Sequence, residues 1–282
     1  MLSGAGRRGF TLVEIMMALA VTLIVTGAMY NLLLKTQRLT RTQSARVALQ
    51  SSVRAGALIV ANELGELNAN SGGSTSQNDV LAFGAHAVTY RAMRGIGFIC
   101  QSAGPGVIRL ARSSFSGHRD PQAGRDEALV FVPADSAMSS EDTWVAVKIA
   151  VVATTLACPG GGEPGITLTL SASPSPLLLE EGTPVRLVEP MELRLYQSGE
   201  IWWLGARSVN TGETIQPLVG PLAPQGFQLE YLDHLGGPTT DRTGIRSIRV
   251  TIRAIEAAAD ATRPPLEEEL TSQVALRNPP VS

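Results

Sequence analysis

The feature that most constrains this chain is an apolar run close to its N-terminus, from Ile15 to Leu34. The run is 20 residues long, and as an α-helix it would cover about 30 Å, the thickness of the hydrocarbon core of a bilayer. Its only polar interruptions are Thr22, Thr26 and Asn31, and hydroxyl groups can donate to the carbonyl one helical turn back. The run therefore predicts one membrane-spanning helix.

The residues ahead of the run are Arg7-Arg8-Gly9-Phe10-Thr11-Leu12-Val13-Glu14. An ordinary secretory signal is cut at small residues that follow its apolar region. Here the small residue Gly9 precedes that region, so a cut between Gly9 and Phe10 would leave the membrane helix on the mature chain. The segment from Gly9 to about Tyr30 resembles the class III signal of type IV pilins and type II secretion pseudopilins.

That resemblance implies how the precursor is processed. In those families a prepilin peptidase cuts after the glycine and methylates the new N-terminal phenylalanine. Carried over to this sequence, residues 1–9 are a leader peptide, the cleavage site lies between Gly9 and Phe10, and Phe10 is the N-methylated residue. The leader contains Arg7 and Arg8, so its removal would change the formal net charge from −2 to −4.

Glu14 is an acidic residue at the edge of the apolar run, and it has two interpretations. An ionised carboxylate at membrane depth costs about 2.5–3.5 kcal/mol on insertion scales, so the side chain could reach back to the interface. The resemblance implies another role, because in pilins the equivalent glutamate pairs with the N-terminal amine of a neighbouring subunit. Glu14 lies one helical turn beyond Phe10, which suits such a pairing. We favour Glu14 as a subunit-assembly carboxylate.

The charges that flank the run leave its orientation ambiguous. Arg7 and Arg8 lie on one side. Four basic residues lie on the other side: Lys35, Arg38, Arg41 and Arg46. A count of positive charges would place the second side in the cytoplasm. The resemblance implies the opposite, because the leader must meet a peptidase that works at the cytoplasmic face. We therefore expect a single-pass protein of the inner membrane, with its C-terminal domain in the periplasm or, in an assembled pilus, outside the cell.

An apolar stripe continues the helix beyond the membrane run. Its members follow spacings of three and four residues, which is typical of one face of an amphipathic helix: Leu49, Val53, Gly56, Val60, Leu64 and Leu67. Turn-forming residues from Asn68 to Gly73 predict the end of the helix. We expect one helix from Leu12 to Leu67, about 84 Å long, with a transmembrane part at residues 10–34 and an amphipathic part at residues 35–68.

The remaining residues, 78–282, show a period of two. Phe227, Leu229 and Tyr231 alternate with polar residues, as expected for a half-buried strand, and the segment around Ile248–Ile252 does the same. Further strand candidates are Val80–Phe83, Ala87–Arg91, Val107–Ala111, Ala128–Val132, Trp144–Val152, Ile166–Leu170, Met191–Tyr196 and Ile201–Ala206. Short strands separated by glycine and proline favour an antiparallel sheet over βαβ units. The predicted fold is α+β, with a long N-terminal helix packed on a largely antiparallel β domain, as in pilins.

The C-terminal third carries a second resemblance. The segment Gly226–Asp233, the isoleucine-rich Ile245–Ile255 and the closing Val274–Asn278 are similar to the end of PilW-type minor pilins and J-type minor pseudopilins. The resemblance implies a minor pilin of the assembly, priming or tip complex of a type IV pilus. The alternative is a minor pseudopilin of a type II secretion system. The implied partners are prepilin peptidase, other minor and major pilins or pseudopilins, and inner-membrane lipid.

The sequence shows no constellation for catalysis. The three histidines, His86, His118 and His234, are widely spaced and do not form a zinc-binding pattern. The run Gly160–Gly162 lacks the Lys-Ser/Thr of a phosphate loop. We therefore expect a protein that is not an enzyme and that holds no metal or cofactor. A membrane-tethered enzyme or ligand-binding protein is the less favoured alternative.

Two charged groups could bind a ligand, although a solvated surface is favoured for each. One is an acidic group that could hold calcium: Asp135, Glu141 and Asp142. Its spacing does not follow a regular set of oxygen ligands. The other is a basic group on one strand that could contact DNA: Arg246, Arg249 and Arg253. Aromatic residues do not alternate with these arginines, and we expect no nucleic-acid partner.

The chain contains two cysteines, Cys100 and Cys158. Both would lie outside the cytoplasm, where disulfides persist. A disulfide between them is favoured over two separate buried thiols.

Overall fold

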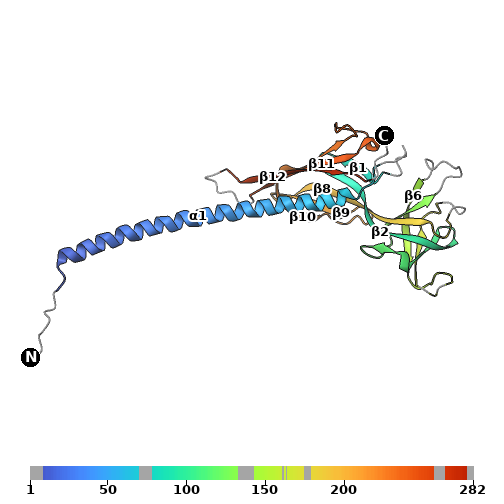
Figure 1. Ribbon diagram of the computed structural model, residues 1–282, viewed down its shortest axis with the longest axis horizontal. Helices are drawn as coiled ribbons and strands as arrows, with labels where there is room; N and C mark the ends of the chain where they lie inside the picture. Colours follow the sequence, from blue (N-terminus) through green and yellow to red (C-terminus); the bar gives the residue numbers. More distant parts are fainter. Residues whose placement is uncertain are drawn as a thin grey trace, which may run out of the picture. The chain divides into compact units, whose positions relative to one another are not determined.

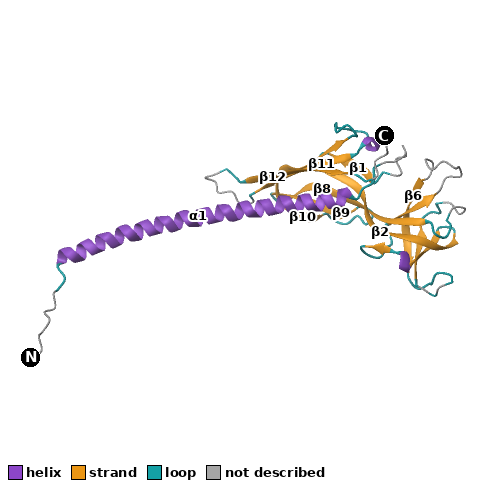
Figure 2. Ribbon diagram, in the orientation of Figure 1, coloured by secondary structure: helices purple, strands orange, loops and turns teal. Residues whose placement is uncertain are grey.

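A computed structural model describes residues 9–69, 78–132, 143–160, 162, 164–174, 179–256 and 264–277 of the chain. The chain divides into two compact units, Met1–Ala48 and Leu49–Ser282. One α-helix and a set of antiparallel strands form most of the regular structure of the described residues (Figures 1 and 2). This is the α+β fold that the sequence predicts.

Helix α1 runs from Leu12 to Gly65 and contains 54 residues. In the first unit, its apolar segment is not buried by any other part of the chain that the structure describes. In the second unit, the helix buries Leu49, Val53, Gly56, Ala57, Val60 and Leu64. Leu67, two residues beyond the end of the helix, is also buried. The predicted apolar stripe is therefore the face that packs against the sheet.

The sheet that receives this stripe is antiparallel throughout. Its strands, in spatial order, are β1 (Val80–Gly84), β2 (Ala87–Gly104), β8 (Pro184–Ser198), β9 (Ile201–Ser208), β10 (Gln216–Leu232), β11 (Ser247–Ile255) and β12 (Glu267–Ala275). Gly56 allows the helix to approach closely, because a Cβ at this position would lie 2.9 Å from Ile252 Cδ1. The helix and the inner face of the sheet form one apolar core that includes Val60, Phe227 and Ile252.

A second apolar core lies inside a closed barrel of strands. The additional strands are β3 (Val107–Ala111), β5 (Glu127–Val132), β6 (Thr143–Ala153) and β7 (Gly165–Leu170). Strand β2 pairs with β3, β3 with β7, β7 with β6, β6 with β5, β5 with β8, and β8 again with β2. The short β4 (Ser116–Gly117) pairs only with β2 among the described strands. The barrel encloses apolar side chains such as Ile108, Leu168 and Leu187.

Strands β2 and β8 belong to both the sheet and the barrel, and each is longer than predicted. The sequence predicts Ala87–Arg91 and Met191–Tyr196, whereas the paired strands extend over 18 and 15 residues. Gly95 on β2 looks like a strand breaker, but a Cβ there would lie 2.9 Å from the Phe115 ring. Glycine at this position therefore allows the aromatic ring to pack on the strand, and the strand continues.

A buried ionic cluster lies between the two cores. Glu189 on β8 follows Leu187 of the barrel core and precedes Leu193 of the helix-sheet core, and its side chain is 2% exposed. Its carboxylate accepts hydrogen bonds from Arg94 Nε at 2.7 Å, from Arg119 Nη2 at 3.1 Å and from Arg125. Burial alone would raise the pKa of Glu189, but the hydrogen bond and charge of Arg94, together with the hydrogen bond from Arg125, outweigh it, and the pKa is lowered from its ordinary value.

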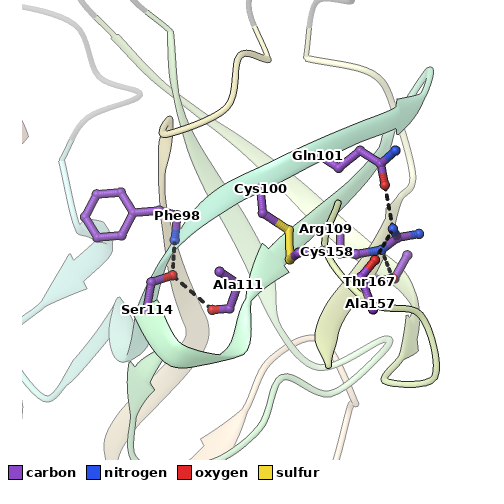
Figure 3. Close-up of a disulfide and its surroundings, with 9 residues drawn as sticks. All are labelled: Phe98, Cys100, Gln101, Arg109, Ala111, Ser114, Ala157, Cys158 and Thr167. Carbon is purple, nitrogen blue, oxygen red and sulfur yellow. Dashed lines mark hydrogen bonds between the residues drawn. A yellow bond between two sulfur atoms is a disulfide. The ribbon is translucent and has the colours of Figure 1, made fainter. Parts of the chain in front are cut away.

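A disulfide joins Cys100 on β2 to Cys158 in the segment between β6 and β7, with their Cα atoms 5.8 Å apart (Figure 3). The buried Arg109 on β3 lies beside it and donates to Thr167 Oγ1 at 3.1 Å and to the carbonyl oxygen of Ala157 at 2.7 Å. The disulfide and Arg109 together attach the segment that carries Cys158 to the barrel wall.

Replacement of Glu189 by alanine should destabilise the second unit by about 3–5 kcal/mol, because three arginines lose a buried acceptor. The measurement is urea unfolding of the full chain in detergent, monitored by the fluorescence of its three tryptophans, Trp144, Trp202 and Trp203, which all lie in the second unit. Because the folded-state pKa of Glu189 is lowered, its contribution is present at neutral pH. It is lost as the pH falls below the ordinary glutamate value of about 4.3. The stability difference between wild type and variant should therefore shrink on acidification.

The matched control is Glu230→Ala, which removes the partner of Arg249 in a pair whose side chains are 43% and 41% exposed. It should cost less than about 1 kcal/mol. Equal losses in the two variants would contradict a special role for the buried cluster.

The disulfide can be tested by electrophoresis after free thiols have been blocked. The protein should run faster without reductant than with it, because the two cysteines are 58 residues apart and their bond compacts the unfolded chain. A loop of this size contributes about 4 kcal/mol in the chain-entropy model. A double Cys100→Ala/Cys158→Ala variant should lose a similar amount and should behave like the reduced wild type. Two titratable thiols in the protein before reduction would contradict the bond.

Candidate functional site at the N-terminus

The Gly9–Phe10 peptide bond lies ahead of helix α1, in residues without regular secondary structure. Both residues are exposed, and the Phe10 side chain is 80% exposed. A Cβ added to Gly9 would have no heavy atom within 4 Å. Packing within the chain therefore does not require glycine at position 9. If glycine is required there, the requirement comes from a partner that binds this segment.

Thr11 and Glu14 begin the helix with a reciprocal pair of hydrogen bonds. The Glu14 backbone N–H donates to Thr11 Oγ1, and the Thr11 backbone N–H donates to Glu14 Oε2, both at 3.3 Å. This arrangement is a capping box, which satisfies two backbone donors that the first turn of a helix leaves unpaired. Sequence reasoning missed Thr11, although the Thr-x-x-Glu spacing ahead of an apolar run is the signal for it.

The Glu14 carboxylate thus has one oxygen in use and one available. Within the described part of the chain, Oε1 accepts no hydrogen bond, and Oε2 accepts the one from Thr11. The carboxylate also lies in the first turn of α1, where the partial positive charge of the helix N-terminus favours it. The site therefore holds a carboxylate with a remaining acceptor one helical turn beyond Phe10.

Polar side chains of the apolar segment bond back to the helix. Thr22 Oγ1 donates to the Ala18 carbonyl at 2.7 Å, and Asn31 Nδ2 donates to the Gly27 carbonyl at 3.0 Å. Because hydrocarbon offers no partner, a spanning helix must satisfy its polar groups internally. Helix α1 is long and apolar enough over this segment to cross a membrane.

The other candidate residues belong to the second unit. The cysteines lie in the barrel of the second unit. Among the described residues, no group of three or more His, Cys, Asp or Glu side chains is arranged to hold a metal ion. Asp135, Glu141 and Asp142 lie outside the described residues.

Arg249 and Arg253 on β11 have partners on the neighbouring β10, whereas Arg246 precedes β11 and bonds to the 3-10 turn before it. Arg249 pairs with Glu230, Arg253 donates to the Pro224 carbonyl at 3.1 Å, and Arg246 donates to the Thr243 carbonyl at 2.9 Å. Hydrogen bonds of this kind are those of a strand face in contact with its neighbours.

Comparison with known proteins gives one match. The family model for the prokaryotic N-terminal methylation motif matches residues 4–30, which include Gly9, Phe10 and Glu14. No curated protein and no solved structure matches the chain. The motif is the prepilin-type signal, and together with the apolar helix it supports a pilin-like or pseudopilin-like subunit that a single helix anchors in a membrane.

Proposed function

We propose that this protein is a minor pilin of the PilW type, which takes part in the assembly, priming or tip complex of a type IV pilus. The observation that carries the proposal is the prepilin-type signal at residues 4–30, continued by a helix whose later part packs on an antiparallel sheet. The similarity of the C-terminal segments to PilW-type pilins favours a minor subunit. A minor pseudopilin of a type II secretion system shares the same signal and is the alternative.

In this proposal prepilin peptidase removes residues 1–9 and methylates Phe10. Residues 10–34 then hold the subunit in the inner membrane, residues 35–68 continue the helix, and residues 78–282 form the periplasmic domain. An oxidising periplasm suits the disulfide between Cys100 and Cys158. The exposed, non-helical Gly9–Phe10 bond suits a peptidase that must reach it.

The physical basis of assembly is the exchange of one apolar environment for another. The apolar segment of α1 is not covered by the described residues, so it is stable in lipid or against similar helices. When neighbouring helices replace lipid, extraction from the membrane becomes feasible. The N-terminal amine of one subunit would then lie in the filament core, where an unpaired charge costs several kcal/mol.

Glu14 is proposed to supply the compensating charge. Its Oε2 is occupied by its own Thr11 N–H, and its Oε1 has no partner among the described residues. A neighbouring amine can therefore be accommodated without breaking the capping box. The capping box positions the carboxylate, and the charge selects the partner.

Processing is tested by replacement of Gly9. Gly9→Leu should leave the precursor uncut, because the peptidase needs a small residue before the bond and the chain itself tolerates a side chain there. Gly9→Ala is the matched control and should still be cut. Mass spectrometry should find a wild-type mature chain that begins at methylated Phe10. A mature N-terminus beyond Tyr30 would indicate an ordinary secreted protein and would refute the proposal.

Assembly is tested by three substitutions that separate charge from capping. Glu14→Ala removes both and should abolish assembly while insertion is kept or improved, because a costly charge leaves the membrane. Glu14→Gln keeps a capping-box side chain but removes the charge, and assembly should fail almost as badly. Thr11→Ala weakens the cap by about 1 kcal/mol but keeps the charge, so assembly should largely persist.

The measurement is the amount of assembled pilus, or of secreted substrate for the alternative, relative to processed subunit in the membrane. Rescue by Glu14→Gln would mean that Glu14 acts only as a helix cap. Normal assembly with Glu14→Ala at normal subunit levels would mean that the carboxylate merely reaches the interface.

A further inference from the structure

Three exposed cations follow the apolar segment directly. Lys35 is the residue after Leu34, and Arg38 and Arg41 follow at intervals of three along helix α1. All three are exposed. The sequence contains no acidic residue between Glu14 and Glu63, so these cations have no opposite charge on neighbouring turns of their own helix. Any opposite charge that contacts them must therefore come from elsewhere.

The helix fixes the height of these cations above the apolar segment. At 1.5 Å per residue, Lys35, Arg38 and Arg41 lie about 1.5, 6 and 10 Å beyond Leu34 along the helix axis. The polar layer of a bilayer extends about 5–8 Å beyond the hydrocarbon on each side. Lysine and arginine side chains are long enough to bridge the remaining distance. All three charges therefore reach the level of the lipid phosphates when the apolar segment spans a membrane.

Two neighbouring residues mark the same interface. Tyr30 lies one turn before Leu34 and is 62% exposed, and Leu39 lies between Arg38 and Arg41 and is 58% exposed. Tyrosine is enriched where hydrocarbon meets head groups. An exposed leucine among cations can contact acyl chains while its neighbours contact phosphates. This mixture is typical of a segment that lies in the interface.

We infer that Lys35, Arg38 and Arg41 form a phosphate-binding collar that selects anionic phospholipid head groups around the membrane end of α1. Residues three apart on a helix are neighbours on its surface, so adjacent cations can contact the same phosphate or two adjacent lipids. The inference rests on the membrane-spanning helix and does not depend on the role proposed in a pilus.

An acidic surface on another subunit is the competing partner for the collar. Lipid is favoured because the collar adjoins the apolar segment without a spacer. Phosphates are present at that height in every membrane that the helix crosses, whether or not other subunits are present. The collar also has a consequence for extraction, since these contacts must be exchanged for others when the helix leaves the bilayer.

The test uses the full chain in nanodiscs made of equal parts of phosphatidylcholine and phosphatidylglycerol. Native mass spectrometry after detergent extraction gives the ratio of the two lipids that remain bound. Wild type should retain phosphatidylglycerol in preference, and the preference should fall about fivefold for each cation removed. A triple Lys35→Gln/Arg38→Gln/Arg41→Gln variant should therefore return the ratio to that of the bulk lipid. High salt should weaken the wild-type preference.

Two control variants make the result specific. Arg38→Lys/Arg41→Lys keeps the charges and should keep the preference. Arg54→Gln removes an exposed cation further along α1 and should leave the preference unchanged. A nanodisc has the same lipids in both leaflets, so an effect of the charges on membrane orientation cannot imitate the result.

An unchanged preference in the triple variant would overturn the inference, as would an equal loss with Arg54→Gln. The inference would also be overturned if the wild type showed no lipid preference and the triple variant co-purified less with other pilins. The partner of the cations would then be an acidic protein surface. Pilus assembly is not measured, so failure of the collar and failure of the proposed function remain distinguishable.

Discussion

The backbone polar groups of helix α1 must be hydrogen-bonded within the helix in two different apolar environments, a membrane and the core that the helix forms with the sheet. When α1 crosses a membrane, the surroundings along Ile15–Leu34 are hydrocarbon, where an unpaired amide costs several kcal/mol. The continuous helix meets this requirement, and Thr22 and Asn31 use its carbonyls for their own donors. From Leu49 onward the same backbone supports a stripe that the sheet buries. A break in the helix would expose polar groups to lipid in one part and to an apolar core in the other.

The second unit has a different constraint, because two apolar cores share β2 and β8. The pairing of these strands shifts register between Met93 and Gly95, and Arg94 lies at that point. On β8 the shift falls between Val188 and Leu187, and the neighbouring Glu189, which pairs with Ala92, accepts the hydrogen bond from Arg94. A buried ion pair adds little net stability over apolar packing, but a buried charge without its partner is costly. Because Glu189 is buried, it needs the hydrogen bonds of the three arginines, and this cluster lies where one core ends and the other begins.

Elements with a strong period were predictable, and those that depend on tertiary contacts were not. The stripe from Leu49 to Leu67 and the alternation at Ile248–Ile252 gave the helix, the sheet and their facing sides. The full extent of β2 was not predicted because Arg94 and Gly95 interrupt the apolar pattern. Both residues have tertiary partners, since Arg94 donates to Glu189 and the Phe115 ring packs against Gly95. Strand β10 was also longer than its apolar core at Phe227–Tyr231, since its first part carries a register shift between Leu222 and Phe227. Barrel closure could not be predicted, because pairing between strands distant in sequence leaves no local signal.

At the candidate site, sequence reasoning found Glu14 and weighed a carboxylate at the interface against pairing with a neighbour, but it missed the capping role. The structure adds Thr11 and shows that the carboxylate already has a partner within its own chain. A carboxylate has two oxygens that can each accept more than one hydrogen bond, so capping and pairing with a neighbour do not compete. Before the proposed assembly, the cap lowers the free-energy cost of placing the carboxylate in the membrane. One of its oxygens accepts a hydrogen bond, and the helix N-terminus favours the anion. In the proposed assembly, the remaining oxygen meets an amine that the same low-dielectric environment would otherwise leave unpaired.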